Sequence, residues 1–239
     1  MCNLYSMTSN KDAIRELARF MNATSAADNL KRMPGIFANG FGPIVRNTTQ
    51  GRELAIARWG MPSHPYALRG KNYDSGVTNV RETEKRHWEP WLGIENRCVV
   101  PANAFCEPDQ ASGSKQNTWF ALDESRPLFF FAGIWTPQHT SVRKVKDGET
   151  TDDLYAFLTT DANAEVKAIH PKAMPVFLRT SEEIEIWLTA PTKDALTLQK
   201  PLPDGSLKII ERGTKKNGPG EEVELAVAEK VPPEQPSLF

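Results

Sequence analysis

The 239-residue sequence has few cysteines, no long hydrophobic run and no excess of either charge. Its three cysteines, Cys2, Cys98 and Cys106, are odd in number and widely spaced, which argues against a disulfide framework and favours a reducing compartment. No hydrophobic run approaches the roughly 18 residues that a membrane span needs. The first residues lack the cationic and apolar segments of a signal peptide. We therefore expect a cytoplasmic protein that does not enter a membrane.

Neither sign of charge dominates, since 29 Lys and Arg residues face 30 Asp and Glu residues and the net charge is −1. This balance excludes a uniformly cationic nucleic-acid binder of the histone kind, although it leaves room for a local basic groove. Hydrophobic residues make up 39% and charged residues 25%, which is ordinary for a globular protein and argues against wholesale disorder. The chain is long enough to bury the core of one large domain.

Hydrophobic periodicity predicts helices toward the ends of the chain and short strands in its middle. Residues 8–22 are expected to form an amphipathic helix capped by Thr8 or Ser9, whereas residues 34–45, rich in Gly and Pro, are expected to form a loop. Strands are expected at 54–59, 97–105, 118–122, 128–135, 154–159 and 174–178. Two more helices are expected at 161–170 and 180–188, the second with Thr180 and Glu183 as a capping box. This arrangement predicts a single α+β domain around a mixed sheet or partial barrel, with flanking helices.

The composition changes near Gly213, after which turn-forming and Pro-rich segments follow. We assign residues 1–222 to the folded domain and residues 223–239 to a flexible tail. The prolines at 232–236 exclude a helix or a central strand in that tail.

Cys2 stands directly after Met1, and its small side chain favours removal of Met1 by an aminopeptidase. Cys2 would then carry two nucleophiles, because an α-amine has a pKa of about 8 and a thiol a pKa of about 8.5. Such a 1,2-aminothiol can condense with an aldehyde to a Schiff base and close a thiazolidine ring on the same carbon, which an internal cysteine cannot do. The alternative is that Cys2 has no chemical role.

Two residues capable of acid–base chemistry follow hydrophobic segments. Glu107 comes near the end of the run 97–108, where it is either a catalytic group or the solvated end of a strand. His170 stands between a helix end and a buried strand, where it is either tuned for proton transfer or caps the helix. Cys98 and Cys106 are expected to be core thiols, because their spacing from each other and from the histidines fits no usual zinc site. We predict no metal and no cofactor.

The polar run at residues 78–84 contains Asn79 and Arg81 and has further Lys and Arg residues nearby. The cations of such a cluster could hold phosphates, and the Asn79 amide could position a substrate. The alternative is a solvated charged loop, since neighbouring Asp and Glu residues offset much of the positive charge.

The chain thus carries an ordered set of short motifs. They are Met1-Cys2, Trp59-Gly60-Met61-Pro62, Asn79-Val80-Arg81-Glu82-Thr83, Arg97-Cys98 followed by Phe105-Cys106-Glu107, Ile169-His170 followed by Met174-Pro175-Val176, and Lys216-Asn217-Gly218-Pro219. In this order the motifs resemble the SOS-response-associated peptidase (SRAP) family, whose members process abasic sites in DNA. The resemblance spans about residues 2–220. It implies one α+β domain with a barrel-like core and a groove for single-stranded DNA.

The resemblance implies a catalytic role for each candidate residue. After removal of Met1, Cys2 would crosslink to the abasic deoxyribose as a thiazolidine, and Asn79 would position the sugar. Glu107 would act as general acid and base beside the α-amine, and His170 would assist ring opening and proton transfer. Peptidase activity would be limited to self-removal of Met1 or to release of the crosslink, and the protein would not be a general protease. A lyase activity is a further implication of the resemblance.

DNA binding is implied for Arg81, which would hold a flanking phosphate, and for the aromatic residues Trp59 and Tyr66. The resemblance therefore predicts a protein that senses abasic sites in single-stranded DNA and shields them by a crosslink during replication and the SOS response.

The chain departs from the family pattern at several positions. These are Asn3-Leu4 in place of Gly-Arg, Pro65-Tyr66 where paired tryptophans are expected, and Cys106 and Pro108 in place of Tyr and Trp around Glu107. The departures bear on DNA affinity and groove shape more than on crosslinking chemistry. Two other functions stay open, an N-terminal-nucleophile cysteine amidohydrolase and a non-enzymatic adaptor that binds single-stranded DNA.

The last five residues, Gln235-Pro236-Ser237-Leu238-Phe239, resemble the short peptide by which bacterial proteins dock on the sliding clamp. Leu238 and Phe239 would fill an apolar pocket, with Gln235 ahead of them, at the end of a Pro-rich tether. The alternative is a pair of hydrophobic residues at a frayed terminus.

Overall fold

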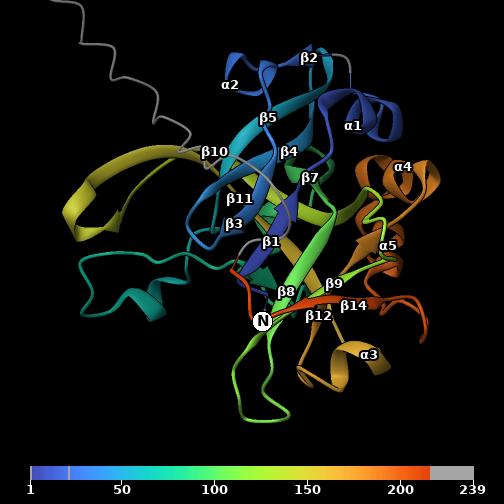
Figure 1. Ribbon diagram of the computed structural model, residues 1–239. Helices are drawn as coiled ribbons and strands as arrows, with labels where there is room; N and C mark the ends of the chain where they lie inside the picture. The colour runs from blue at the N-terminus through green and yellow to red at the C-terminus, as the bar shows by residue number, and fades with distance from the viewer. Residues whose placement is uncertain (1, 21, 216–239) are drawn as a thin grey trace, which may run out of the picture.

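The computed structural model describes residues 2–20 and 22–215, whose strands form two sheets (Figure 1). The larger sheet has the order β12-β11-β10-β7-β4-β5-β2. Its strands are β2 (Asn22–Ala23), β4 (Phe41–Thr48), β5 (Gly51–Trp59), β7 (Arg97–Ala102), β10 (Phe129–Lys144), β11 (Gly148–Thr160) and β12 (Met174–Pro175). Because β11 also pairs in parallel with β5, through Leu154–Arg58 and Tyr155–Trp59, the strands β5, β4, β7, β10 and β11 close into a barrel.

The second sheet lies beside the barrel and carries the start of the chain. Its order is β14-β9-β8-β1-β3, with β1 (Leu4–Met7), β3 (Met33–Phe37), β8 (Ala104–Pro108), β9 (Asn117–Ala121) and β14 (Lys208–Arg212). Two short strands complete the described sheets: β6 (Asn79–Val80) runs parallel to β11, and β13 (Phe177–Leu178) runs antiparallel to β10. The mixed barrel with added strands and short helices confirms the predicted α+β fold.

The helices are short and lie around the sheets (Figure 1). They are α1 (Lys11–Ala18), α2 (Ser25–Asp28), α3 (Ala164–Lys167), α4 (Ser181–Thr189) and α5 (Thr192–Ala195), with 3-10 turns η1 (Pro65–Leu68), η2 (Glu89–Trp91), η3 (Ile94–Asn96), η4 (Val145–Asp147) and η5 (Leu196–Leu198). The predicted capping box of α4 is confirmed, since Thr180 and Glu183 each accept a hydrogen bond from the other's backbone N–H. Within the described residues, no helix combines the length and hydrophobicity needed to cross a membrane.

The centre of the molecule is aromatic. The ring of Tyr5, from β1, packs edge-on against Trp59 of β5 at 5.2 Å and against Phe157 of β11 at 6.0 Å. The hydroxyls of Tyr5 and Tyr155 lie 2.5 Å apart. A Cβ on Gly42 would lie 2.5 Å from the first hydroxyl and 2.6 Å from the second, so this position in β4 requires glycine.

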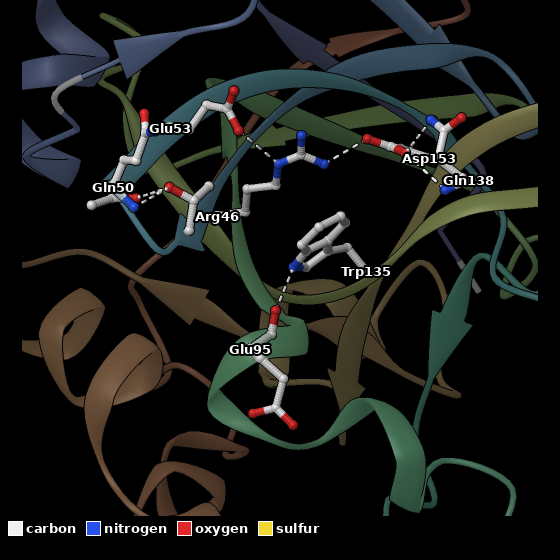
Figure 2. Close-up of polar contacts among 9 residues, drawn as sticks. Arg46, Gln50, Glu53, Glu95, Trp135, Gln138 and Asp153 are labelled. Atoms are coloured by element: carbon white, nitrogen blue, oxygen red, sulfur yellow. Dashed lines mark hydrogen bonds and ion pairs between the residues drawn. The ribbon is translucent and has the colours of Figure 1, made fainter.

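A polar network centred on Arg46 joins four barrel strands on the side shown in Figure 2. Its guanidinium donates to Glu53 at 3.1 Å and to Asp153 at 2.5 Å and lies 4.2 Å from the centre of the Trp135 ring. Asp153 also accepts a hydrogen bond from the Gln138 side chain at 2.9 Å. Because its charges are paired with each other, the network has a structural role.

Two predicted helices were wrong in their bounds. The first helix covers only Lys11–Ala18 and is capped by Asn10, not by Thr8 or Ser9, and Arg19 ends it in the left-handed region with φ 53°. Residue 21 of the predicted helix lies outside the described residues. The helix expected at 161–170 is reduced to α3.

The loop expected at residues 34–45 is wrong, because β3 and β4 occupy most of it. Pro34 is tolerated since β3 is an edge strand in the described sheet. Pro43 is tolerated because β4 pairs with β7 only at Val45 and Arg46. Residue 43 therefore does not need a backbone N–H to pair with β7. The predicted boundary at residues 222 and 223 and the tail beyond it lie outside the described residues.

Candidate functional site

The structure brings Cys2, Asn79, Glu107 and His170 together at one end of the barrel. The register of β1 against β8 pairs Leu4 with Cys106, and this antiparallel pairing places Cys2 alongside the end of β8 that carries Glu107. All four residues are buried, with exposed fractions between 0% and 6%. The site therefore lies within the packed structure, where its polar groups are largely removed from water.

Asn79 holds the start of the chain. Its amide nitrogen donates to the carbonyl of Cys2 at 2.8 Å and to the hydroxyl of Thr78 at 2.7 Å. The Cys2 thiol donates to the carbonyl of Leu4 at 3.3 Å. These contacts fix the backbone of Cys2 with respect to β6.

His170 reaches the site from the loop that follows α3. Its backbone N–H donates to the Val166 carbonyl at 2.6 Å, and its ring forms a hydrogen bond with the Pro108 carbonyl. The neighbouring Ile169 carbonyl accepts hydrogen bonds from residues 110 and 111, which follow β8. This anchoring brings Nδ1 of His170 to 3.7 Å from Oε2 of Glu107.

Burial sets the protonation of these two side chains. It raises the pKa of Glu107 to about 8, and it lowers the pKa of His170 to about 4, helped by nearby positive charges that include Lys172. At pH 7 most Glu107 side chains are therefore protonated and His170 is neutral. Their close approach is then a contact between neutral groups and not an ion pair. Glu107, with its pKa close to neutrality, is suited to give and take a proton.

The Cys2 thiol is held in its protonated form. Burial is the main cause that raises the pKa of Cys2, and the charge of Glu107 adds to it. A nucleophilic Cys2 in this environment needs a neighbouring group that accepts its proton, and Glu107 is close enough to influence its titration.

Thr159 is a site candidate that the sequence reading missed. Asn79 pairs with Phe157 of β11, and Thr159 lies two residues farther along the same strand, on the same face as Phe157. The Oδ1 atom of Asn79 and the hydroxyl of Thr159 are both buried and have no hydrogen-bond partner among the described residues. A threonine in a hydrophobic strand does not by itself indicate a functional residue in the sequence. Only the register of β6 against β11 shows that Thr159 lies near Asn79.

A groove of about 660 Å³ opens beside Asn79. Arg81, Lys85 and Tyr66 line it, and the Tyr66 side chain is 69% exposed. His87 packs against the Trp88 ring at 4.5 Å and forms part of the wall. The groove thus combines cations and an exposed aromatic ring with one residue of the buried site, Asn79.

Trp59 does not reach this groove, which corrects the expectation that it contacts DNA. It is fully buried, its ring stacks on Phe157 at 5.0 Å, and its indole N–H donates to the Thr78 carbonyl at 3.0 Å. Trp59 instead supports the residue that precedes Asn79.

Several other predicted residues stand apart from this site. Cys98 and Cys106 are buried and unpaired thiols, and the described residues contain no cluster of His, Cys, Asp and Glu that could hold a metal. Gln235, Leu238 and Phe239 lie outside the described residues.

Comparisons with known proteins agree with this architecture. The family profile described as SOS response associated peptidase (SRAP) matches residues 1–215. Among solved structures, a protein from Bordetella bronchiseptica is 23% identical with a TM-score of 0.63, and the alignment covers 87% of this chain and 97% of that one.

Two further solved structures show the same fold. A protein from Bacteroides thetaiotaomicron is 22% identical with a TM-score of 0.65, over 87% of this chain and 90% of that one. A phage-related protein from Bordetella bronchiseptica is 21% identical with a TM-score of 0.59, over 87% and 92% of the two chains. No match was found among curated proteins.

Proposed function

The chain belongs to the SOS response associated peptidase family, and from this premise we propose that it captures abasic sites in single-stranded DNA by a covalent bond to Cys2. The family description denotes a peptidase associated with the SOS response, and the proposal adds the substrate and the chemistry. The observation that carries it is the convergence of Cys2, Asn79, Glu107 and His170 beside a groove lined by Arg81 and Tyr66.

The reaction begins once Met1 has been removed. The α-amine of Cys2 adds to the aldehyde carbon of the open abasic sugar, and loss of water gives a Schiff base. The sulfur of the thiol then bonds to the carbon of the protonated C=N group as the thiol gives up its proton, which gives a thiazolidine. Holding the amine and the aldehyde together turns a bimolecular condensation into a positioned one.

The neighbouring side chains supply the proton transfers. Protonated Glu107 can donate to the hydroxyl that leaves as water, and the resulting carboxylate can then accept the proton of the Cys2 thiol. Neutral His170 can accept a proton from the sugar hydroxyl as the ring opens. Asn79 holds the Cys2 carbonyl and so fixes the backbone that carries the two nucleophiles. The thiazolidine removes the imine that would otherwise permit β-elimination, so the strand stays intact.

DNA binding is proposed to rest on Arg81 for a phosphate and on Tyr66 for stacking with a base. Peptide-bond cleavage is proposed to be limited to removal of Met1. Reversal of the crosslink is proposed as a separate step, in which water hydrolyses the thiazolidine back to the aldehyde and the free amine and thiol of Cys2.

The test is crosslinking of the full-length protein to a single-stranded oligonucleotide with one abasic site, followed by denaturing gel electrophoresis and intact mass. We expect Cys2→Ala to abolish the adduct and Cys106→Ala, a matched control at another buried thiol, to retain it. An equal yield from Cys2→Ala, an adduct mapped to another side chain, or Met1 still present in crosslinked protein would contradict the proposal.

A further inference from the structure

Arg81 already has anionic and polar partners within the protein. Its guanidinium donates to the carboxylate of Asp161 and to the carbonyl of Lys172. The Arg81 side chain is 41% exposed and the Asp161 side chain 80% exposed. The residue suited to hold a DNA phosphate is therefore paired with a carboxylate that lies at the protein surface.

We propose that Asp161 occupies, in the free protein, the position on Arg81 that a DNA phosphate takes, so that strand binding exchanges one anion for another. The inference rests on the proposed function, because it requires DNA to enter the groove. In this role Asp161 competes with DNA phosphates for Arg81 and so lowers the affinity of the groove for nucleic acid.

The exchange is chemically matched. A carboxylate and a phosphate accept the same charge-assisted hydrogen bonds from a guanidinium, so one can replace the other without moving the arginine. Exposed ion pairs contribute little, and the Asp161 side chain can turn into water when a phosphate arrives. The carboxylate therefore competes with the phosphate without blocking the groove.

The backbone around Arg81 is held independently of this ion pair. The Gln199 side chain donates to the Arg81 carbonyl at 2.7 Å and to the Thr159 carbonyl at 3.0 Å, and it accepts from Thr83 at 2.9 Å. The exchange thus concerns the tip of the Arg81 side chain, while the strands that carry the groove stay in place.

The chain offers a matched control for the charge of Asp161. Glu82 lines the same groove and pairs with Lys85 instead of Arg81. Glu82→Gln removes one negative charge, as Asp161→Asn does, but it leaves the Arg81–Asp161 pair intact. A comparison of the two variants separates competition for Arg81 from a general reduction of negative charge.

The experiment measures binding of a fluorescent, undamaged oligo-dT strand at low salt, by anisotropy, to the full-length protein and its variants. We expect Asp161→Asn to tighten binding by about two- to fivefold, the range that an exposed ion pair supports, and Glu82→Gln to tighten it less. In an Arg81→Gln background the gain from Asp161→Asn should fall to that of Glu82→Gln.

The inference would be overturned if Asp161→Asn and Glu82→Gln increased the affinity equally, or if Asp161→Asn gave its full increase in the Arg81→Gln background. The absence of measurable binding by every variant would also overturn it. Crosslinking of the unmodified protein to abasic DNA reports separately on the proposed function. If that crosslink is absent while the coupling of Asp161 and Arg81 is present, the crosslinking part of the proposed function fails, whereas DNA binding in the groove and the inference that rests on it stand.

Discussion

At the scale of single residues, the chemistry of the site depends on how burial sets the protonation states of Glu107 and His170. Burial raises the pKa of Glu107 from 4.5 to about 8 and lowers that of His170 from 6.5 to about 4. Each shift also makes the free energy of unfolding depend on pH, because the folded and unfolded chains bind different numbers of protons.

The signs of the two contributions are opposite. Between about pH 4.5 and 8 the unfolded chain has ionised Glu107 while the folded chain has not, so this residue makes stability fall as pH rises. Between about pH 4 and 6.5 the unfolded chain has protonated His170 while the folded chain has not, so this residue makes stability rise with pH. Only Glu107 acts from about pH 6.5 to 8.

We predict that Glu107→Gln is more stable than the unmodified protein at pH 8, by an amount on the order of a few kcal/mol, and similar to it near pH 4. The variant should also crosslink more slowly by about 100-fold or more, since it loses the general acid and base. Urea unfolding at several pH values measures the first effect, with Glu124→Gln at an exposed position as the control. A stability difference that does not change with pH would contradict the raised pKa.

The order of motifs in the sequence was enough to propose Cys2, Asn79, Glu107 and His170 as one site, and the structure places them together. Thr159 and Asp161 were not predicted. A hydroxyl in a strand and a carboxylate in a polar segment are both common, and only the pairing of β6 with β11 brings them near Asn79 and Arg81. Trp59 was misassigned because an aromatic residue in a motif looks the same whether it faces the core or the solvent.

At the scale of elements, the segment between β5 and β6 forms a wall of the groove and is held by Asp74. Its carboxylate accepts hydrogen bonds from the backbone and hydroxyl of Ser63, at 3.0 and 2.6 Å, and from the Gly76 N–H at 2.8 Å. Burial would raise the pKa of Asp74, but these hydrogen bonds and the charge of Arg143 lower it. The Asp74 N–H also donates to the carbonyl of Val142, in the long β10–β11 hairpin that projects on the same side (Figure 1).

We predict that Asp74→Ala destabilises the protein by about 1–3 kcal/mol, because buried donors lose their acceptor. It should also raise the DNA concentration needed for half-maximal crosslinking, since Tyr66 is carried by the same segment, while the rate at saturating DNA changes little. Thermal unfolding and a DNA titration of crosslinking provide the two measurements. Asp147→Ala, at the exposed tip of the hairpin, is the control. Loss of stability with an unchanged half-saturation would show that the segment does not contribute to binding.

Local signals predicted some elements and failed for others, and the difference has a physical cause. The capping box of α4 involves only neighbouring residues, so the sequence contains all of its determinants. The strand β3 depends on its pairing with β1, and β4 pairs both with its neighbour β5 and with the distant β7. These pairings tolerate Pro34 and Pro43, whereas glycine and proline content alone predicted a loop there. The run 97–105 was expected as one strand, but β7 ends at Ala102 and β8 starts in the other sheet at Ala104.

At the scale of the whole molecule, the fold class and a barrel-like core could be predicted, but the strand pairing that closes the barrel could not. Hydrophobic patterning gives strands and their approximate order, which is enough for an α+β domain with a mixed core. Closure rests on the parallel pairing of β5 with β11, whose residues are about a hundred positions apart in sequence. That pairing closes the barrel, and the packing of Tyr5 in its aromatic core fixes the position of β1 and of Cys2, which precedes it.

The C-terminal residues allow a prediction about how the whole protein is brought to DNA. If Gln235, Leu238 and Phe239 dock on the bacterial sliding clamp, deletion of residues 235–239 should abolish binding to purified clamp, and Leu238→Ala with Phe239→Ala should do the same. Crosslinking to a free abasic oligonucleotide should be unaffected, because it needs only the site at Cys2. Ser237→Ala, which keeps both hydrophobic residues, is the control. Clamp binding that survives the deletion would remove the tail from the function of this protein and leave recruitment to the DNA groove alone.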